Sequence, residues 1–300
     1  MSRRFATLDV FTTRPHAGNP LAVVFDSDGL DTEAMQAIAR EFNLSETVFV
    51  APPANPTNSA SVRIFTPAAE LPFAGHPTVG SAVLLALRAA ADGRASGSLV
   101  LEEKVGLVPC TVSVQGARAG RATFSLPRLP AEIDQPAGAP LLAEALGLDE
   151  REIGFDTHVP SIYSAGVAFT LVPVFGLQAM GRIRLDTGLW PKVMKPEGHP
   201  NAFVYCRQTQ DAGHHYHARM FAPSMGIPED PATGSAVAAF AGAVMRFDQP
   251  EDGEHVFVVE QGYEMCRPSQ IELGLTVASG KLVAARIGGA AVVVSEGTLL

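Results

Sequence analysis

The chain has 300 residues, of which 47% are hydrophobic, and it carries a formal net charge of −9 at pH 7. The apolar content excludes a mainly disordered chain, and the length allows one large domain or two of ordinary size. The acidic balance argues against nucleic acid or an anionic membrane as partner, because both require concentrated positive charge. The cysteines Cys110, Cys206 and Cys266 are too widely spaced for a disulfide framework or a CxxC metal site. We therefore expect reduced thiols in a cytoplasmic protein.

Neither a targeting segment nor a membrane span is expected. The first residues include no apolar stretch of signal-peptide length. The uncharged run 159–181 is long, but prolines and glycines interrupt it, whereas a spanning helix needs about 20 predominantly apolar residues. We predict two short strands there, one over 161–172 and one after Pro173, separated by a Pro/Gly break.

Alternating patterns in the first half predict a mixed protein of helices and strands. In chain order we expect strands at 5–12 and 21–25, a helix at 31–42, strands at 46–51 and 61–67, a helix at 77–91 and a hairpin at 98–114. In the first helix, apolar residues such as Met35 and Ala39 recur at helical spacing, and Asp31 or Thr32 can cap its start. Strands that alternate with helices indicate an α/β or α+β class.

Two short motifs occur twice in the same order. The strand-like RIFTP at 63–67 has a partner, RMFAP, at 219–223, and HPTVGSAV at 76–83 has a partner, DPATGSAV, at 230–237. Chance similarity between two alanine-rich helices is the alternative. Because strand, loop and helix entry recur together, we interpret the chain as two halves built on one plan.

The two helix entries follow the same local logic. Pro77 and Pro231 suit the first helical position, where a missing N–H costs nothing, and His76 and Asp230 precede them at the predicted N-cap. The stretches that follow are apolar on nearly every face, which predicts buried helices. Small residues at their start, such as Gly80, let a backbone or a ligand approach closely.

We therefore predict an α+β protein of two similar domains, each a curled, mostly antiparallel sheet around a central apolar helix. The predicted domains are 1–125 and 126–285, and the strand 286–300 is free to return to the first domain. We expect the two helix starts to face one cleft between the domains. Their N–H groups and positive dipole ends favour an anion such as a carboxylate.

Three titratable residues are candidates for the chemistry. His76 titrates near neutrality and suits proton transfer, although it could equally be a buried, hydrogen-bonded loop histidine. Asp230 could meet a ligand or be only an N-cap. Glu46 opens a predicted strand among apolar neighbours, so it is either solvated at the strand edge or partly buried. Burial would raise its pKa toward neutrality, as a general acid/base requires.

Other patterns are weaker. The histidine-rich segment 214–217 runs directly into a predicted strand, and no cysteine or acidic cluster accompanies it in the sequence, so we predict no metal site there. The chain has neither a nucleotide-binding glycine motif nor a G-x-S-x-G nucleophile motif. The glycines of 286–294 are predicted to form a bulge or turn where a C-terminal strand begins.

Five blocks together resemble a known family. They are DVFTTRPHAGNPLAVV at 9–24, LSETVFV at 44–50, RIFTPAAELPFAGHPTVGSA at 63–82, MFAPSMGIPEDPATGSA at 220–236 and VEQGYEMCRPS at 259–269. On these blocks the chain resembles the PhzF-like proteins, the phenazine-biosynthesis isomerase family, which share the diaminopimelate epimerase fold. The resemblance implies catalytic residues at Glu46, His76 and Asp230. It is weakest over 135–200.

The related epimerases use two cysteines, one at the start of each central helix, as opposed acid and base. The helix entries here hold no thiol, so the resemblance implies that one carboxylate, Glu46, takes a proton and returns it on the same side. That fits a cofactor-independent isomerase that moves a proton between carbons of a small carboxylate substrate. His76 and Asp230 would bind or polarise that substrate.

Further expectations follow from the resemblance. The expected substrate contacts are Asn19, Ser45, Gly75, Gly234 and Ser235. No cofactor and no metal are expected, and the small-molecule carboxylate is the only expected partner apart from a second copy of the chain in a homodimer, which stays open. The competing interpretation is a non-catalytic protein that binds or senses a small carboxylate in the same cleft.

Overall fold

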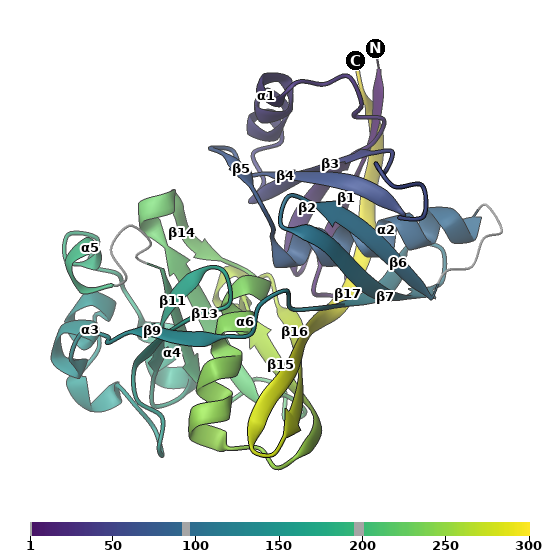
Figure 1. The fold of residues 1–300 in the computed structure, drawn as a ribbon. Coiled ribbons are helices and arrows are strands. Elements are labelled where there is room, and N and C mark those ends of the chain that lie inside the picture. The colour runs from purple at the N-terminus through teal and green to yellow at the C-terminus, as the bar shows by residue number, and fades with distance from the viewer. Residues whose placement is uncertain (1, 92–96, 195–200) are drawn as a thin grey trace. The chain divides into compact units, whose positions relative to one another are not determined.

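The computed structural model describes residues 2–91, 97–194 and 201–300. The chain divides into two compact units: unit 1 is Met1–Ser125 with Gly288–Leu300, and unit 2 is Leu126–Ile287. The long strand β17 (Lys281–Leu299) supplies residues to both units (Figure 1). Each unit combines a curled sheet with few helices, so the predicted α+β class is confirmed.

Unit 1 is a strand barrel. Its elements are β1 (Arg3–Val10), β2 (Asn19–Val24), α1 (Thr32–Phe42), β3 (Glu46–Ala51), β4 (Ala60–Phe65), β5 (Glu70–Leu71), α2 (Gly75–Ala91), β6 (Ser98–Glu103), β7 (Gly106–Gln115) and β8 (Ala119–Ser125). Pairing runs β17–β1–β2–β3–β4–β6–β7–β8 and returns to β17, which closes the barrel. The pairs β2–β3 and β4–β6 are parallel.

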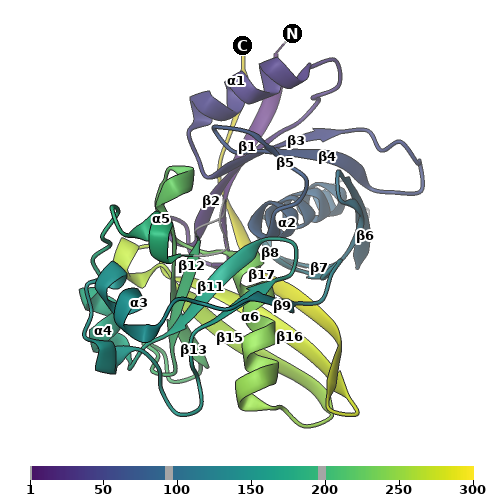
Figure 2. The same cartoon turned by 60° about the vertical axis from the view of Figure 1, so that its left-hand side comes forward.

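The central helix of unit 1 is α2, which packs against β1, β2, β3, β6, β7 and β8 (Figure 2). Its first ten residues are all buried, as expected for a helix that is apolar on nearly every face. A Cβ atom at Gly80 would lie 2.5 Å from Leu21 Cδ2. Glycine is therefore required at that position for α2 to approach the strands.

Unit 2 has a second curled sheet. Its elements are β9 (Ala131–Asp134), α3 (Ala139–Leu146), β10 (Ser161–Ser164), β11 (Ala168–Pro173), α4 (Leu177–Arg182), α5 (Trp190–Val193), β12 (Ala202–Cys206), β13 (Tyr216–Ala222), β14 (Ile227–Asp230), α6 (Gly234–Ala243), β15 (Gly253–Gln261) and β16 (Ser269–Ala278). Pairing runs β9–β10–β11–β12–β13–β15–β16–β17. The central helix α6 packs against β9, β10, β11 and β16.

The two units repeat one topology. The parallel pairs β2–β3 and β4–β6 of unit 1 correspond to β11–β12 and β13–β15 of unit 2. The repeated motif lies at the C-terminal ends of β4 and β13. At the starts of these strands, Ala60 lies opposite Leu101 just as Tyr216 lies opposite Val259. The register therefore aligns β4 and β6 of unit 1 with β13 and β15 of unit 2.

The arginine of each repeat makes the same contacts. Arg63 pairs with Glu70 through Nε and Nη2, at 2.8 and 3.0 Å, and Arg219 pairs with Glu229 in the same two-pronged way, at 2.8 and 2.7 Å. Each guanidinium also lies over the phenylalanine two residues on. These shared contacts make chance similarity of the motifs untenable.

Several predicted elements are confirmed. Helix α1 spans Thr32–Phe42 with Asp31 as its N-cap, whose carboxylate accepts the N–H of Ala34 at 2.8 Å. The hairpin of β6 and β7 forms within 98–115. Strand β3 begins at Glu46, as predicted.

The predicted helix starts are wrong in both halves. Helix α2 begins at Gly75, so His76 lies in its first turn rather than at the N-cap. Helix α6 begins only at Gly234, with Thr233 as N-cap, and Asp230 is the last residue of β14. Strand pairing delays the start of α6, because Asp230 pairs with Met220 of β13. The Asp230 carbonyl also accepts the side-chain N–H of Gln261 instead of a helical N–H.

Two further predictions need correction. Within 159–181 the break falls at 165–167 between β10 and β11, where Gly166 has φ +126°, and the segment after Pro173 forms α4 instead of a strand. The glycines of 286–294 form no separate turn, since they lie inside β17. Among the described residues, no helix is both long and apolar enough to cross a membrane.

Candidate active site

Glu46 and His76 form the first half of the candidate site, within unit 1. Glu46 is the first residue of β3, and His76 lies in the first turn of α2. Glu46 Oε2 and His76 Nε2 are 3.5 Å apart, and the two side chains are 14% and 6% exposed. The structure thus places a carboxylate beside an imidazole at the N-terminus of a buried helix.

Burial decides the charge of His76. It lowers the pKa of His76 to about 3, and a hydrogen bond to the Pro20 backbone offsets this only in part. Because Pro20 can only accept, and because Nε2 makes no hydrogen bond within the described chain, we assign the bonded nitrogen as Nδ1. At neutral pH the ring is uncharged, and Nε2 presents a lone pair to Glu46.

The other predicted residues of this half adjoin the pair, or the Pro20 that binds His76, along the chain. Asn19 is buried at the start of β2, next to the Pro20 that binds His76. Gly75 is buried and opens α2, while Ser45 immediately precedes Glu46. The structure therefore brings Asn19, Ser45 and Gly75 together with Glu46 and His76.

Asp230 organises the second set of predicted residues, within unit 2. It is buried at the end of β14, and its Oδ2 accepts the hydroxyl of Thr233 at 2.5 Å. Gly234 and Ser235 follow as the first residues of α6. Asp230, Gly234 and Ser235 thus lie together, and the prediction that both sets act on one substrate stays a prediction.

Sequence reasoning missed the residues that hold the Asp230 segment. The side chain of Gln261 binds Asp230 and Thr233, and Ser269 Oγ donates to the Pro231 carbonyl at 2.9 Å. Gly262 has φ +78°, and a Cβ there would lie 2.5 Å from the Pro231 carbonyl oxygen. Gln261, Gly262 and Ser269 all lie in the block 259–269. That block carries the family resemblance, but the sequence analysis assigned no site residue within it.

The histidine-rich segment does have acidic partners, contrary to the sequence-based expectation. His217 lies between Glu260 and Glu264, with nitrogen–oxygen distances of 2.7 and 2.9 Å, and His214 also contacts Glu260. Burial opposes a charge on His217, but the hydrogen bonds to both glutamates outweigh it and raise its pKa to about 9. A protonated imidazole has no lone pair for a metal. In the parts of the chain that the structure describes, no group of three or more His, Cys, Asp or Glu could hold a metal ion.

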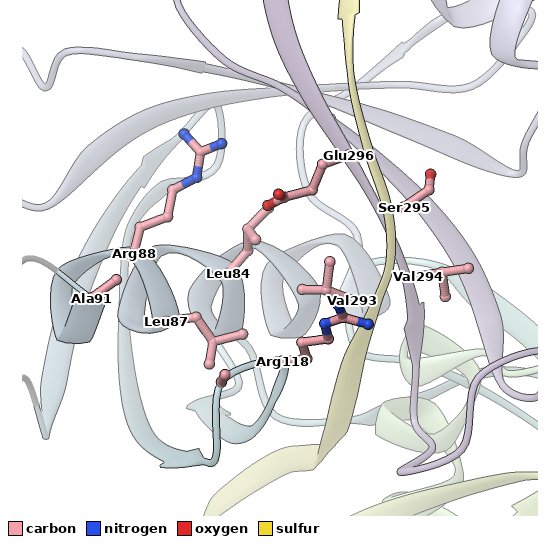
Figure 3. A pocket seen from close by; sticks show the side chains of 10 residues that line it. Leu84, Leu87, Arg88, Ala91, Arg118, Val293, Val294, Ser295 and Glu296 are labelled. Atoms are coloured by element: carbon pink, nitrogen blue, oxygen red, sulfur yellow. The ribbon is translucent and has the colours of Figure 1, made fainter.

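A separate cavity of about 340 Å³ lies along the C-terminal half of α2, against β17 (Figure 3). Leu84, Leu87 and Val293 line it, together with Arg88 and Glu296. It starts nine residues after Gly75, roughly 14 Å along the helix. None of the candidate catalytic residues lines it, so it is distinct from the Glu46–His76 pair.

A known protein family matches nearly the whole chain. The family model described as phenazine biosynthesis-like protein matches residues 8–297. The chain belongs to this family. The match spans both units, so it covers the Glu46–His76 pair and the Asp230 segment alike.

Individual relatives support the same assignment. An uncharacterized isomerase of Mesorhizobium japonicum is 52% identical, with 99% of each chain covered. A trans-2,3-dihydro-3-hydroxyanthranilate isomerase of Pseudomonas aeruginosa is 35% identical, with 98% of each covered. The crystal structure of a Bacillus anthracis PhzF-family protein matches with a TM-score of 0.88 at 29% identity, covering 100% of this chain and 99% of the other. The predicted family and enzyme class, an isomerase, are thereby confirmed.

Proposed function

We propose that this protein is an isomerase that moves a proton between carbons of a small carboxylate substrate, with Glu46 as the group that takes and returns the proton. The observation that carries this proposal is the contact of Glu46 Oε2 with Nε2 of His76 at 3.5 Å. Three of the relatives are named trans-2,3-dihydro-3-hydroxyanthranilate isomerase. That molecule is the first substrate to test.

The neutral state of His76 supports a base role for Glu46. A carboxylate that faces a lone pair gains a hydrogen bond when it takes up a proton, because Glu46 can then donate to Nε2. A protonated histidine would instead form an ion pair and weaken the base. Burial, which lowers the pKa of His76 to about 3, removes that competition at neutral pH.

The buried thiols do not offer an alternative base. Burial raises the pKa of both Cys110 and Cys206 to about 12. Both stay protonated near neutral pH, and a thiol is a poor base. A two-thiol racemase scheme would therefore have to use Cys266, the third cysteine, alone. A single carboxylate that serves both steps suits these residues better and requires neither cofactor nor metal.

Deuterium exchange tests this proposal. The protein is incubated in D₂O with trans-2,3-dihydro-3-hydroxyanthranilate and a panel of small hydroxy and amino acids, and carbon-bound deuterium is measured by NMR. We expect exchange with the native protein and a loss of about 10²–10⁴-fold in Glu46→Gln, which keeps shape but not basicity. Glu41→Gln, at an exposed position of α1, is the matched control. Near-native exchange in Glu46→Gln would remove Glu46 from the mechanism, and ligand binding without any exchange would favour a binding protein.

Asp230 is proposed to contact the substrate rather than to support the helix start. Thr233 is the N-cap of α6, so Asp230→Asn leaves the cap in place. We expect a normally folded variant whose turnover or affinity falls by about tenfold or more. A tenfold loss is equivalent to roughly 1.4 kcal/mol. An Asp230→Asn protein with native turnover would show that the carboxylate has no substrate role.

A further inference from the structure

Glu103 and Gln261 occupy the same place in the two units. Each is the last residue of the strand that follows the central helix, β6 or β15. The parallel ladders align Leu101 with Val259, and Glu103 and Gln261 both lie two residues further on. Both side chains are buried, with exposed fractions of 8% and 0%, and each contacts a threonine at the entry of the central helix.

In unit 2 the amide of Gln261 sets the direction of a hydrogen-bond chain. Nε2 donates to the Asp230 carbonyl at 2.7 Å and to Thr233 Oγ1 at 3.1 Å, and Oε1 accepts the Thr233 N–H at 3.2 Å. Because Oγ1 of Thr233 accepts from Gln261, its own proton points to Asp230 Oδ2. Gln261 therefore fixes both the backbone and the carboxylate of Asp230.

In unit 1 the same direction of donation would place a proton on Glu103. Thr78 Oγ1 lies 2.8 Å from the Ala74 carbonyl oxygen and 2.8 Å from Glu103 Oε1. A hydroxyl has one proton and cannot donate to both acceptors. If Glu103 is a carboxylic acid, it donates to Thr78 and leaves the Thr78 proton for Ala74, which directly precedes Gly75 and His76.

The surroundings of Glu103 agree with a neutral acid. Its Oε2 makes no hydrogen bond within the described chain, which would leave an ionised carboxylate poorly satisfied. Burial raises the pKa of Glu103 to about 7, against the effect of the Thr78 hydrogen bond. The nearby Cys110 thiol brings no positive charge to stabilise a carboxylate.

We propose that Glu103, held as a carboxylic acid, and Gln261 are corresponding positioning residues that orient the helix entries carrying His76 and Asp230. Neither touches the reacting atoms in this scheme. Each donates to a threonine hydroxyl, and that hydroxyl donates onward, to the Ala74 carbonyl in unit 1 and to the Asp230 carboxylate in unit 2. This inference rests on the proposed function for its effect on turnover, but the protonation of Glu103 stands independently of it.

Paired substitutions test whether Glu103 acts as a neutral hydrogen-bond donor or as a charged carboxylate. Glu103→Gln keeps a donor to Thr78, so we expect kcat within about threefold of native, whereas Glu103→Met removes the donor and is expected to lower kcat by about tenfold or more. Gln261→Met is expected to lower kcat by a similar factor. Two variants are the controls. Glu102→Gln changes the preceding residue on β6, which binds the loop at 54–58, and Gln270→Met changes an exposed residue of β16.

Infrared spectroscopy tests the protonation of Glu103 without any substrate. In D₂O near neutral pH we expect the C=O stretching band of a protonated carboxylic acid in the native protein and in Glu102→Gln, and its loss in Glu103→Gln. Circular dichroism shows whether Glu103→Met folds. If it does not, the infrared band still tests whether Glu103 is protonated.

The outcomes distinguish this proposal from the proposed function. Absence of exchange by the native protein on every substrate would remove the proposed function, while the carboxylic-acid band would still support a neutral Glu103. Loss of activity in Glu103→Gln equal to that in Glu103→Met would mean that a carboxylate is needed. That result would overturn the positioning role. So would native kcat in Glu103→Met or in Gln261→Met, and so would the absence of the carboxylic-acid band from the native protein.

Discussion

Replacing His217 with glutamine should remove a pH-dependent part of the stability of unit 2. The imidazole of His217 is fully buried between Glu260 and Glu264. Its pKa rises from 6.5 to about 9 in the folded protein. One pKa unit corresponds to 1.36 kcal/mol, so this shift contributes about 3 kcal/mol to the free energy of unfolding.

The sign follows from proton binding. The folded state holds the proton more tightly than the unfolded state, so the stabilisation is fully present below the unfolded pKa of about 6.5 and is lost as pH rises through about 9. The native protein should therefore exceed His217→Gln in stability by about 3 kcal/mol near pH 6, and the gap should shrink to less than about 1 kcal/mol near pH 9. Thiols that lose protons on unfolding at high pH do so in both proteins, so their effect cancels in the difference.

The fluorescence of Trp190 can be used to follow the unfolding of unit 2. It is the only tryptophan of the chain, is fully buried in unit 2, and packs edge-on against Phe221 of β13, the strand that carries His217. Urea unfolding followed by its fluorescence at several pH values reports on this unit. His255→Gln, on β15, where the imidazole contacts the Glu251 carbonyl, is the control for the loss of a histidine side chain. A gap for His217→Gln that is constant from about pH 6 to about pH 9 would refute a protonated His217.

Three further predictions concern the repeated arginines, a strained glycine and metal. Arg219→Met should destabilise unit 2 by about 3–5 kcal/mol, and Arg63→Met should cost clearly less, because the Arg63 side chain is 34% exposed against 8% for Arg219; equal losses in urea titrations would contradict this. Gly262→Ala should displace the Pro231 carbonyl and lower turnover, whereas Gly280→Ala, also at positive φ but with open space around it, should cost only the backbone strain of about 1–2 kcal/mol. Dialysis against a strong chelator should leave activity and unfolding midpoint unchanged, and a stoichiometric transition metal that activity requires would contradict the proposed chemistry.

Local patterns predicted the elements whose ends depend on nearby residues. Helix α1 has its apolar face and its Asp31 cap within one short segment, so the sequence located its end at Phe42 and placed its start within one residue, with Asp31 and Thr32 both open as the cap. The repeat of arginine and phenylalanine in β4 and β13 was equally visible, because the same letters recur. The glutamates that pair with these arginines lie at different spacings, seven residues from Arg63 and ten from Arg219, and only the structure identified them.

The helix starts failed because distant contacts set them. Aligned by sequence, His76 and Asp230 hold the same position before a proline. In unit 1 the chain is already helical there, whereas in unit 2 the pairing of Asp230 with Met220 and the amide of Gln261 delay the helix to Gly234. A capping rule that considers only the next few residues has no access to either contact.

The correspondence of Glu103 and Gln261 shows why the repeat has to be followed through backbone register as well as through letters. The two side chains have nearly the same shape, but their one-letter codes differ, so the sequence alignment of the halves passes over them. Their partners, Thr78 and Thr233, are themselves one position out of step in that alignment, since Thr78 falls on Ala232. Both halves retain a side chain at one strand end that lies within hydrogen-bond distance of a threonine hydroxyl at the helix entry. In the proposed scheme this side chain is the donor in both halves. Such a device survives changes of residue type as long as the donated proton remains, which is why an amide can stand where the other half has an acid.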